Sequence, residues 1–301
     1  MDLPPATPVV LELDPADYAL TLDSSAESAG RLTGGIAARA DRRVVLRFSG
    51  ESPPWGDLQV TVTDPALELA DALFLVSVLL LTEHHQDRFL HRPQRWGFVD
   101  AHTQRRVELP HPPRIETAQA LLGGLPVPTR IRLLVEACQI AVPVWTAWAR
   151  SAELVYFDGV MSMAAVPQDL AEATIASVRT WLADGDPSPL ARWRAEYRSL
   201  HWPMLEDEWE PPPNVYYSLF APCNLVDCAL DDGSLSAALV CIRQAAAARA
   251  TDTEDNFLGE PARKAFFLAW WRACVRVLLA EPPGGPPLSS FQTSWRSPRS
   301  G

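Results

Sequence analysis

The spacing of apolar residues differs between the N-terminal and C-terminal parts of this chain of 301 residues, and the difference limits the folds that it can adopt. Over residues 9–64 they come in short runs, and in Leu58–Thr63 they alternate with polar residues. From Thr129 onward they recur every three or four residues. A period of two is typical of β-strands, and a period near 3.6 is typical of α-helices. We therefore predict an α+β fold, predominantly α, in which a small N-terminal antiparallel β part precedes a helical bundle.

Short runs rich in β-branched and aromatic residues predict four strands: Val9–Leu13, Tyr18–Leu22, Arg43–Phe48 and Leu58–Thr63. Between them, Gly34-Gly35 is typical of a turn. Asp64-Pro65 indicates the start of a helix, because aspartate caps free N–H groups and proline at the first position loses no hydrogen bond. We expect this helix to extend to about His91. Trp96–Val99 and Arg105–Leu109 predict a second hairpin.

Proline and glycine divide the helical part. Pro143 predicts a kink, Pro167 and Ser188-Pro189 predict helix starts, and Gly185-Asp186-Pro187 predicts a stop. Three further helices are expected at Asn214–Leu230, Ser234–Ala250 and Ala262–Glu281. The last is apolar nearly all round, with Arg272 and Arg276 as its exposed strip, so it should be the central member of the bundle. We expect four parts: a β-rich N-terminal part at 1–64, a connecting part with a helix and a β-hairpin at 65–128, and a helical bundle at 129–281. The fourth is a disordered tail at 282–301, rich in Pro, Gly and Ser.

Charge and composition exclude several classes of partner. A net charge of −11 argues against nucleic acid, because phosphate binding needs a basic surface. The N-terminus has no basic region followed by an apolar one, so we expect no signal peptide. Leu67–Leu81 has 15 residues, fewer than the roughly 20 of a membrane span. Five scattered cysteines suit free thiols. These features predict a cytoplasmic protein that binds no membrane.

No catalytic, cofactor-binding or metal-ligating motif is present in the sequence. Neither GxSxG nor a phosphate-binding glycine loop occurs. His201 with Cys223 is a conceivable nucleophilic pair, but nothing in the sequence distinguishes it. Five histidines lie close together with several arginines, but their spacing matches no zinc motif, so we expect a mildly basic surface: His84, His85, His91, His102 and His111. The cysteines are expected to fill the core.

One acidic segment carries most of the net charge. Residues 201–260 hold 11 acidic residues against Arg243 and Arg249, which is −9 of the total of −11. Tryptophan and tyrosine lie close to these acids in the sequence, which is typical of a site that binds a basic protein. The alternative is that the aromatic rings fold back onto the helical bundle. The predicted partner-binding residues are Trp202, Glu206, Asp207, Glu208, Trp209, Glu210, Tyr216 and Tyr217.

The helical part resembles a known class of proteins in its alanine-rich composition and helix layout. The run Asn224–Ala250 followed by Ala262–Glu281 is similar to the alanine-rich helices of some bacterial immunity proteins. The resemblance covers about a quarter of the chain, and it transfers no functional residue. It implies a non-enzymatic protein that neutralises a basic toxin through an acidic surface. Two alternatives stay open: an enzyme whose site lies between the β part and the helices, with His84, His91 or His102 as acid or base, and a structural subunit of a larger assembly.

Overall fold

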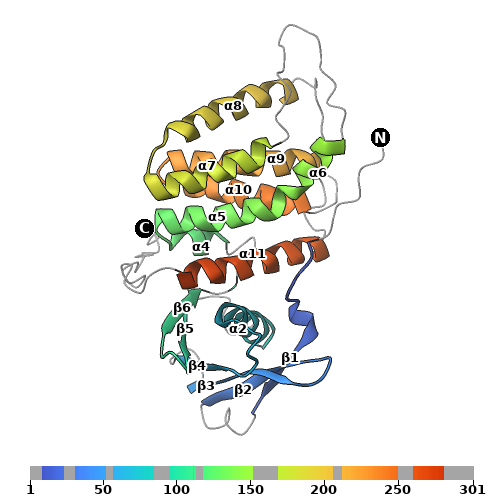
Figure 1. Cartoon of the computed structure of the whole chain (residues 1–301), viewed down its shortest axis with the longest axis vertical. Helices are drawn as coiled ribbons and strands as arrows, with labels where there is room; N and C mark the ends of the chain where they lie inside the picture. The colour runs from blue at the N-terminus through green and yellow to red at the C-terminus, as the bar shows by residue number, and fades with distance from the viewer. Residues whose placement is uncertain are drawn as a thin grey trace, which may run out of the picture.

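The computed structural model describes residues 9–23, 31–51, 57–84, 95–110, 112, 118–151, 169–205, 212–249 and 260–280. These residues form a sheet layer, a helical bundle and one long helix between the two (Figure 1). The predicted α+β class with predominant helix is confirmed. A single continuous cluster of buried side chains extends from the sheet through the long helix into the bundle.

Six strands form one sheet in the order of the sequence. After a short 3-10 helix, η1 (Pro15–Asp17), they are β1 (Tyr18–Leu22), β2 (Arg31–Ala38), β3 (Val44–Glu51), β4 (Leu58–Val62), β5 (Arg95–Asp100) and β6 (Arg106–Pro110). Neighbours pair antiparallel except β4 and β5, which are parallel. The second predicted hairpin is therefore confirmed, and it joins the first four strands in a single mixed sheet.

A helical crossover explains the parallel pair. Between β4 and β5 the chain forms α2 (Leu69–Val76) and a π-helical segment, η2 (Ser77–His84), which lie along the sheet (Figure 1). Parallel neighbours need such a crossover. The helix begins later than predicted, because the Asp64 carboxylate accepts the Ala66 N–H (3.1 Å) and closes a turn first. The predicted helical residues 85–91 lie outside the described residues.

Two predictions about the strands are wrong. Residues 9–13 form no strand. Gly34-Gly35 is not a turn but the middle of β2, where Gly34 faces Leu22 on one side and Phe48 on the other. A Cβ at Gly34 would lie 2.3 Å from the Thr21 carbonyl oxygen. Glycine is therefore used here for the close approach of two strands rather than for a turn.

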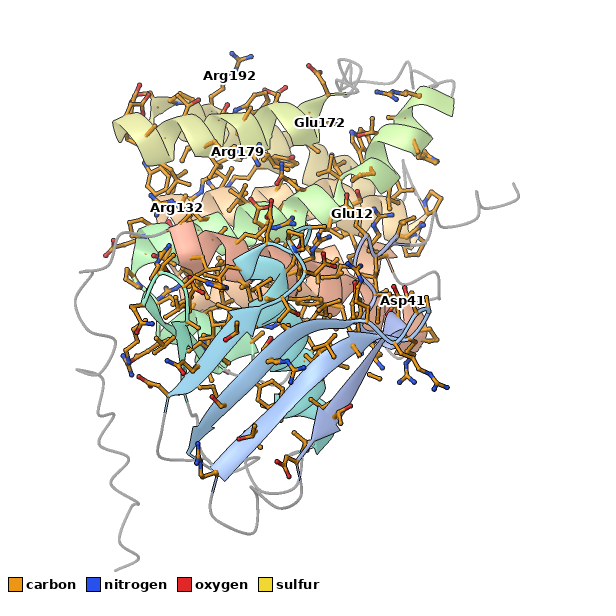
Figure 2. The ribbon with its side chains drawn as sticks, turned by 60° about the horizontal axis from the view of Figure 1, so that its bottom comes forward. Glu12, Asp41, Arg132, Glu172, Arg179 and Arg192 are labelled. Carbon is orange, nitrogen blue, oxygen red and sulfur yellow. The ribbon has the colours of Figure 1, made fainter. Side chains whose placement is uncertain are left out.

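The face of the sheet that points away from α2 carries small and polar side chains. Thr33, Ser49 and Gln59 form one row across β2, β3 and β4. Residues on the other face, such as Phe48 and Val60, are buried. Figure 2 brings this layer forward, with Asp41 at the turn between β2 and β3. Antiparallel strands commonly leave one face to water in this way, and the alternation predicted for Leu58–Thr63 follows it.

The helices after the sheet lie mostly where the sequence predicts them. They are α4 (Ala118–Gly123), α5 (Val127–Ala141), α6 (Pro143–Ser151), α7 (Leu170–Asp184), α8 (Ser188–Leu205), α9 (Pro213–Leu230), α10 (Leu235–Arg249) and α11 (Glu260–Ala280). Pro143 separates α5 from α6, and Gly185, at φ +81°, ends α7. Pro167 lies outside the described residues.

The prediction that α11 is the central member of the bundle is wrong, because α11 lies between the bundle and the sheet layer and packs against both (Figure 1). Its two adjacent tryptophans form hydrogen bonds on opposite sides of the helix, one to the bundle and one to the sheet layer. Trp270 donates from Nε1 to the Leu133 carbonyl of α5, and Trp271 donates from Nε1 to the Ser77 hydroxyl of η2, both at 2.8 Å.

The exposed strip predicted on α11 is wrong for Arg272. Arg272 donates from Nε to Asp71 of α2 at 2.8 Å, and its side chain is 15% exposed. Arg276 reaches the same carboxylate at 3.2 Å. Glu12 also contacts Arg272, at 2.9 Å, and lies beside the helices (Figure 2). A buried carboxylate on a neighbouring helix therefore accounts for charged residues in the middle of an apolar helix.

Candidate functional site

The junction between α5 and α6 marks one end of the bundle. Ser218, in the second turn of α9, donates from its hydroxyl to the Ala141 carbonyl at 2.9 Å. The same hydroxyl accepts the Trp145 N–H at 3.0 Å. The beginning of α9 is therefore held against this junction, and Ser218 satisfies backbone groups that the helix break leaves without helical partners.

Two more helix ends meet the same junction. Arg249, the last residue of α10, donates from Nε to the Ile140 carbonyl at 2.6 Å. Glu172, in the first turn of α7, accepts a hydrogen bond from the Thr146 hydroxyl of α6. We call this the junction end of the bundle, where α5 and α10 end and α6, α7 and α9 begin or lie alongside.

The direction of α8 brings its last turn to the junction end as well. Arg194, near the start of α8, pairs with Asp227 (2.6 Å) and Asp231 (2.7 Å) at the end of α9. The two helices thus run antiparallel, so Leu205 lies on the side where α9 begins at Pro213 (Figure 1).

The opposite end of the bundle has tight turns. Gly185 and Gly233, both with positive φ, connect α7 to α8 and α9 to α10. Arg130 of α5 donates to the carbonyl oxygens of Leu122, Leu125 and Gly233. Left-handed glycines and satisfied carbonyls are typical of compact, structural turns.

The structure places only part of the predicted binding residues. Glu206, Asp207, Glu208, Trp209 and Glu210 lie outside the described residues. Trp202 lies in the last turns of α8, at the junction end.

Tyr216 and Tyr217 lie in the first turns of α9, at the same end. Both are half-buried and pack against the core, and Tyr216 stacks on Phe220 with 4.6 Å between ring centroids. Burial raises the pKa of Tyr216.

The acids of the long acidic segment do not form one surface. Asp227 and Asp231 are compensated by Arg194, at the far end of the 18-residue helix α9. With a rise of about 1.5 Å per residue, α9 separates these two carboxylates from its own first turn by about 16 Å or more. Only the acids near Leu205 and Arg249 remain candidates for a shared surface.

The alternative of an enzyme site that uses His84, His91 or His102 finds little support in the described structure. His102 lies in the turn between β5 and β6, and its Nε2 is 3.4 Å from the Val62 carbonyl oxygen. His84 ends η2, and His91 lies outside the described residues. In the described ranges, no three His, Cys, Asp or Glu side chains are placed to hold a metal ion.

The cysteines occupy the core, as predicted. All five are free, and four of them are buried: Cys138, Cys228, Cys241 and Cys274. Burial, together with the nearby charge of Asp227, raises the pKa of Cys223 to about 12. At neutral pH Cys223 is therefore a neutral thiol rather than the thiolate that a nucleophile needs.

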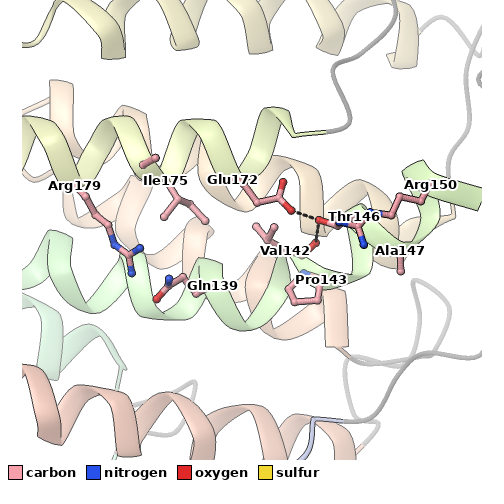
Figure 3. Close-up of a pocket in the computed structure, with 10 residues that line it drawn as sticks. Gln139, Val142, Pro143, Thr146, Ala147, Arg150, Glu172, Ile175 and Arg179 are labelled. Carbon is pink, nitrogen blue, oxygen red and sulfur yellow. Dashed lines mark hydrogen bonds between the residues drawn. The ribbon is translucent and has the colours of Figure 1, made fainter.

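A groove of about 410 Å³ runs along the bundle between α7 and the α5–α6 pair (Figure 3). Its lining is apolar in the middle and charged toward the two ends: Gln139, Val142, Pro143, Thr146, Ala147, Arg150, Glu172, Ile175, Ala176 and Arg179. Sequence reasoning missed this groove, because which helices lie next to each other is a tertiary property. The sequence held a weak signal, since the lining residues of α5 and α6 and those of α7 each follow helical spacing.

Comparisons with protein family models, with curated proteins and with solved structures find no match to this chain. Among the helices that the structure describes, none combines the length and apolarity needed to cross a membrane. The chemistry of the junction end and of the groove is thus the basis for inferring function.

Proposed function

We propose that this chain is a non-enzymatic protein-binding protein of the immunity type, which neutralises a basic toxin in the bacterial cytoplasm. The partner would be held at the junction end of the bundle. The surface would comprise the acids 206–208 and 210 with Trp202 and Trp209, flanked by Tyr216 and Tyr217.

The observation that carries the proposal is where the acidic connections leave the bundle. The chain departs from the junction end after Ser151, Leu205 and Arg249. The connections that follow, residues 152–168, 206–211 and 250–259, contain nine acidic residues and no lysine or arginine. They account for −9 of the net charge of −11. The three helices that precede these acidic segments therefore end at one end of a packed scaffold, whose other end has tight structural turns.

Such a distribution suits a basic partner. Rigid helices that present connecting segments at one end are a common way to build a binding surface. Complementary charge speeds association and rejects partners of the same sign, and tryptophan and tyrosine supply much of the binding energy at interface centres. The resemblance to alanine-rich immunity proteins indicates the same kind of partner.

The test measures binding to the product of the neighbouring gene, in the arrangement expected of a toxin and its immunity protein. We expect association of the wild-type chain to slow as salt rises, because screening shortens the range of steering. Glu206→Gln with Glu208→Gln should lower the association rate about tenfold at low salt. Trp209→Ala should raise the dissociation rate by about tenfold or more.

A matched control neutralises the same number of acids at the opposite end. Asp184 and Asp232 are both exposed and lie next to the two tight turns. Asp184→Asn with Asp232→Asn should leave both rates unchanged. Equal effects from the two double variants would show that net charge, not the junction end, controls association. Unchanged binding by Glu206→Gln, Glu208→Gln and Trp209→Ala combined would contradict the proposal.

A further inference from the structure

The groove between α7 and the α5–α6 pair has the geometry of a site for a third helix. One wall consists of positions 139, 142, 143, 146, 147 and 150, and the other of 172, 175, 176 and 179. The second wall is one face of α7, and the first follows α5 and α6 across the break at Pro143; both have residues at steps of three and four. Ala147 and Ala176 are small and exposed, so a helix backbone could approach closely.

The groove exists because α5 and α6 are separate helices. Pro143 has no N–H, so it cannot supply the hydrogen bond that the Gln139 carbonyl would receive inside an uninterrupted helix. Beyond the break, α6 is tied to α7 through Thr146 and Glu172. Val142 and Ile175 form a buried apolar floor between the two walls. An apolar floor with a few polar groups at its margins is typical of a ligand site.

The charges toward the two ends of the groove are positive. Figure 3 shows Arg179 and Arg150 toward opposite ends, with Glu172 between them. Glu172 is engaged by the Thr146 hydroxyl. Arg179 has a long contact of 3.9 Å with Glu136, and in the described part of the chain no carboxylate lies within salt-bridge distance of Arg150. Both guanidinium groups thus have donors left for an added carboxylate.

The length of the groove sets the spacing of its ligand. Arg179 lies beside Glu136, so the two guanidinium groups are separated by roughly the distance from residue 136 to residue 150. Fourteen residues of helix span at most about 21 Å, which is about four turns.

From this geometry we propose that the groove binds an amphipathic helix of a partner protein, about four turns long, with an apolar face and a carboxylate near each end. The apolar side chains lie on Val142 and Ile175, and the carboxylates meet Arg150 and Arg179. This is the helix-in-groove mode of recognition, with charge setting its specificity. The proposed ligand is acidic, opposite in charge to the basic partner of the proposed function.

The experiment uses a fluorescent alanine-rich peptide with leucines along one helical face and a glutamate on that face at each end, about four turns apart. Its control replaces both glutamates with lysine. Fluorescence anisotropy with the full-length chain should show the glutamate peptide binding at least about tenfold more tightly than the lysine peptide. Equal affinity for both peptides, or no binding of either, overturns the proposal.

Charge reversal provides the decisive variant. Both arginines are exposed, so Arg150→Glu with Arg179→Glu should fold, which circular dichroism verifies. The double variant should prefer the lysine peptide, which a merely structural role of these residues would not produce. Ala176→Phe, which fills the groove, should abolish binding of both peptides. A double variant that keeps the preference for glutamate shows that the peptide binds elsewhere and overturns the proposal.

The outcome is independent of the proposed function. Glu206→Gln with Glu208→Gln should leave binding of the glutamate peptide unchanged, whereas it should slow association with the basic partner. Each site can therefore fail without the other.

Discussion

At the scale of single residues, Tyr197 has the least satisfied environment in the bundle. Its side chain is fully buried in α8, with its ring 5.8 Å from that of Phe220. Its hydroxyl has no hydrogen-bond partner among the described residues. The Thr174 hydroxyl donates to the Leu170 carbonyl at 2.7 Å. Burial raises the pKa of Tyr197, so it remains a neutral phenol.

Removing this hydroxyl should cost nothing. A buried hydroxyl without a partner loses its hydrogen bonds to water and gains none in the protein. We therefore expect the stability of Tyr197→Phe to be unchanged or up to about 1 kcal/mol higher. Tyr197→Leu, which also loses the aromatic contact with Phe220, should lose about 1–3 kcal/mol. Urea unfolding measures both. A loss of more than 1 kcal/mol in Tyr197→Phe would mean that the hydroxyl has a partner after all.

Two adjacent glycines in β2 offer a matched comparison. A Cβ at Gly34 would lie 2.3 Å from the Thr21 carbonyl oxygen, whereas at Gly35 the nearest atom is the Leu46 carbonyl oxygen at 3.1 Å. Backbone atoms cannot turn aside as a side chain can, so Gly34→Ala should destabilise the protein by about 2 kcal/mol. Gly35→Ala should cost less than half as much. Thermal unfolding of the pair decides, and equal losses would contradict the packing argument.

At the scale of elements, the contact between α2 and α11 depends on one carboxylate. Burial alone raises the pKa of Asp71, but the hydrogen bonds and charges of Arg272 and Arg276 outweigh it and hold that pKa below its ordinary value. The Asp71 side chain is only 11% exposed, and Arg276 is 44% exposed. Without Asp71, the described structure leaves Arg272 with only the exposed Glu12 as an ion-pair partner, and Arg276 loses its ion pair.

We predict that Asp71→Asn lowers the free energy of unfolding by about 2 kcal/mol at neutral pH, less than for a fully buried pair because Arg276 reaches water. A lowered folded-state pKa means that ionised Asp71 stabilises the fold above the unfolded pKa of about 4. That contribution is lost as the pH falls through the folded pKa. The difference between wild type and Asp71→Asn should therefore be constant near neutrality and shrink below about pH 4.

Glu12 is the control for this prediction, because it contacts the same Arg272 but is 77% exposed. Exposed ion pairs contribute little, so Glu12→Gln should change stability by less than about 0.5 kcal/mol. If the two variants lose the same amount, burial is not the source of the effect.

At the scale of the whole molecule, α11 couples the sheet layer to the bundle. Trp270 bonds to α5 and Trp271 bonds to η2, and both indoles are buried. We expect a single cooperative transition, in which tryptophan fluorescence and far-ultraviolet circular dichroism change at the same denaturant concentration. Two separated transitions would show that the layers fold independently.

Local patterns predicted most elements, and the misses have physical causes. Proline and glycine act on their own backbone, so Pro143 and Gly185 mark the ends of α5 and α7 in the sequence as in the structure. β2 was missed because Gly34-Gly35 is as typical of a turn as of a close strand contact. The partner of Arg272 could not be predicted, because Asp71 is 201 residues away and no local pattern connects them.

The candidate sites divide in the same way. Acidic and aromatic residues around 206–210 are visible in the sequence, because charge and side-chain type are properties of each residue. That Asp227 and Asp231 are neutralised by Arg194, and that α10 ends against the α5–α6 junction, depends on helix packing.

The sequence by itself determined the kind of each element, because period, proline and glycine act within a few residues of chain. It also determined how much acid the chain carries and in which segments. Only the tertiary structure decided which charges are buried in pairs and which helix ends lie together. It also decided that two helical faces leave a groove with arginines toward its ends. The physical reason is that these properties arise from contacts between residues far apart in the chain.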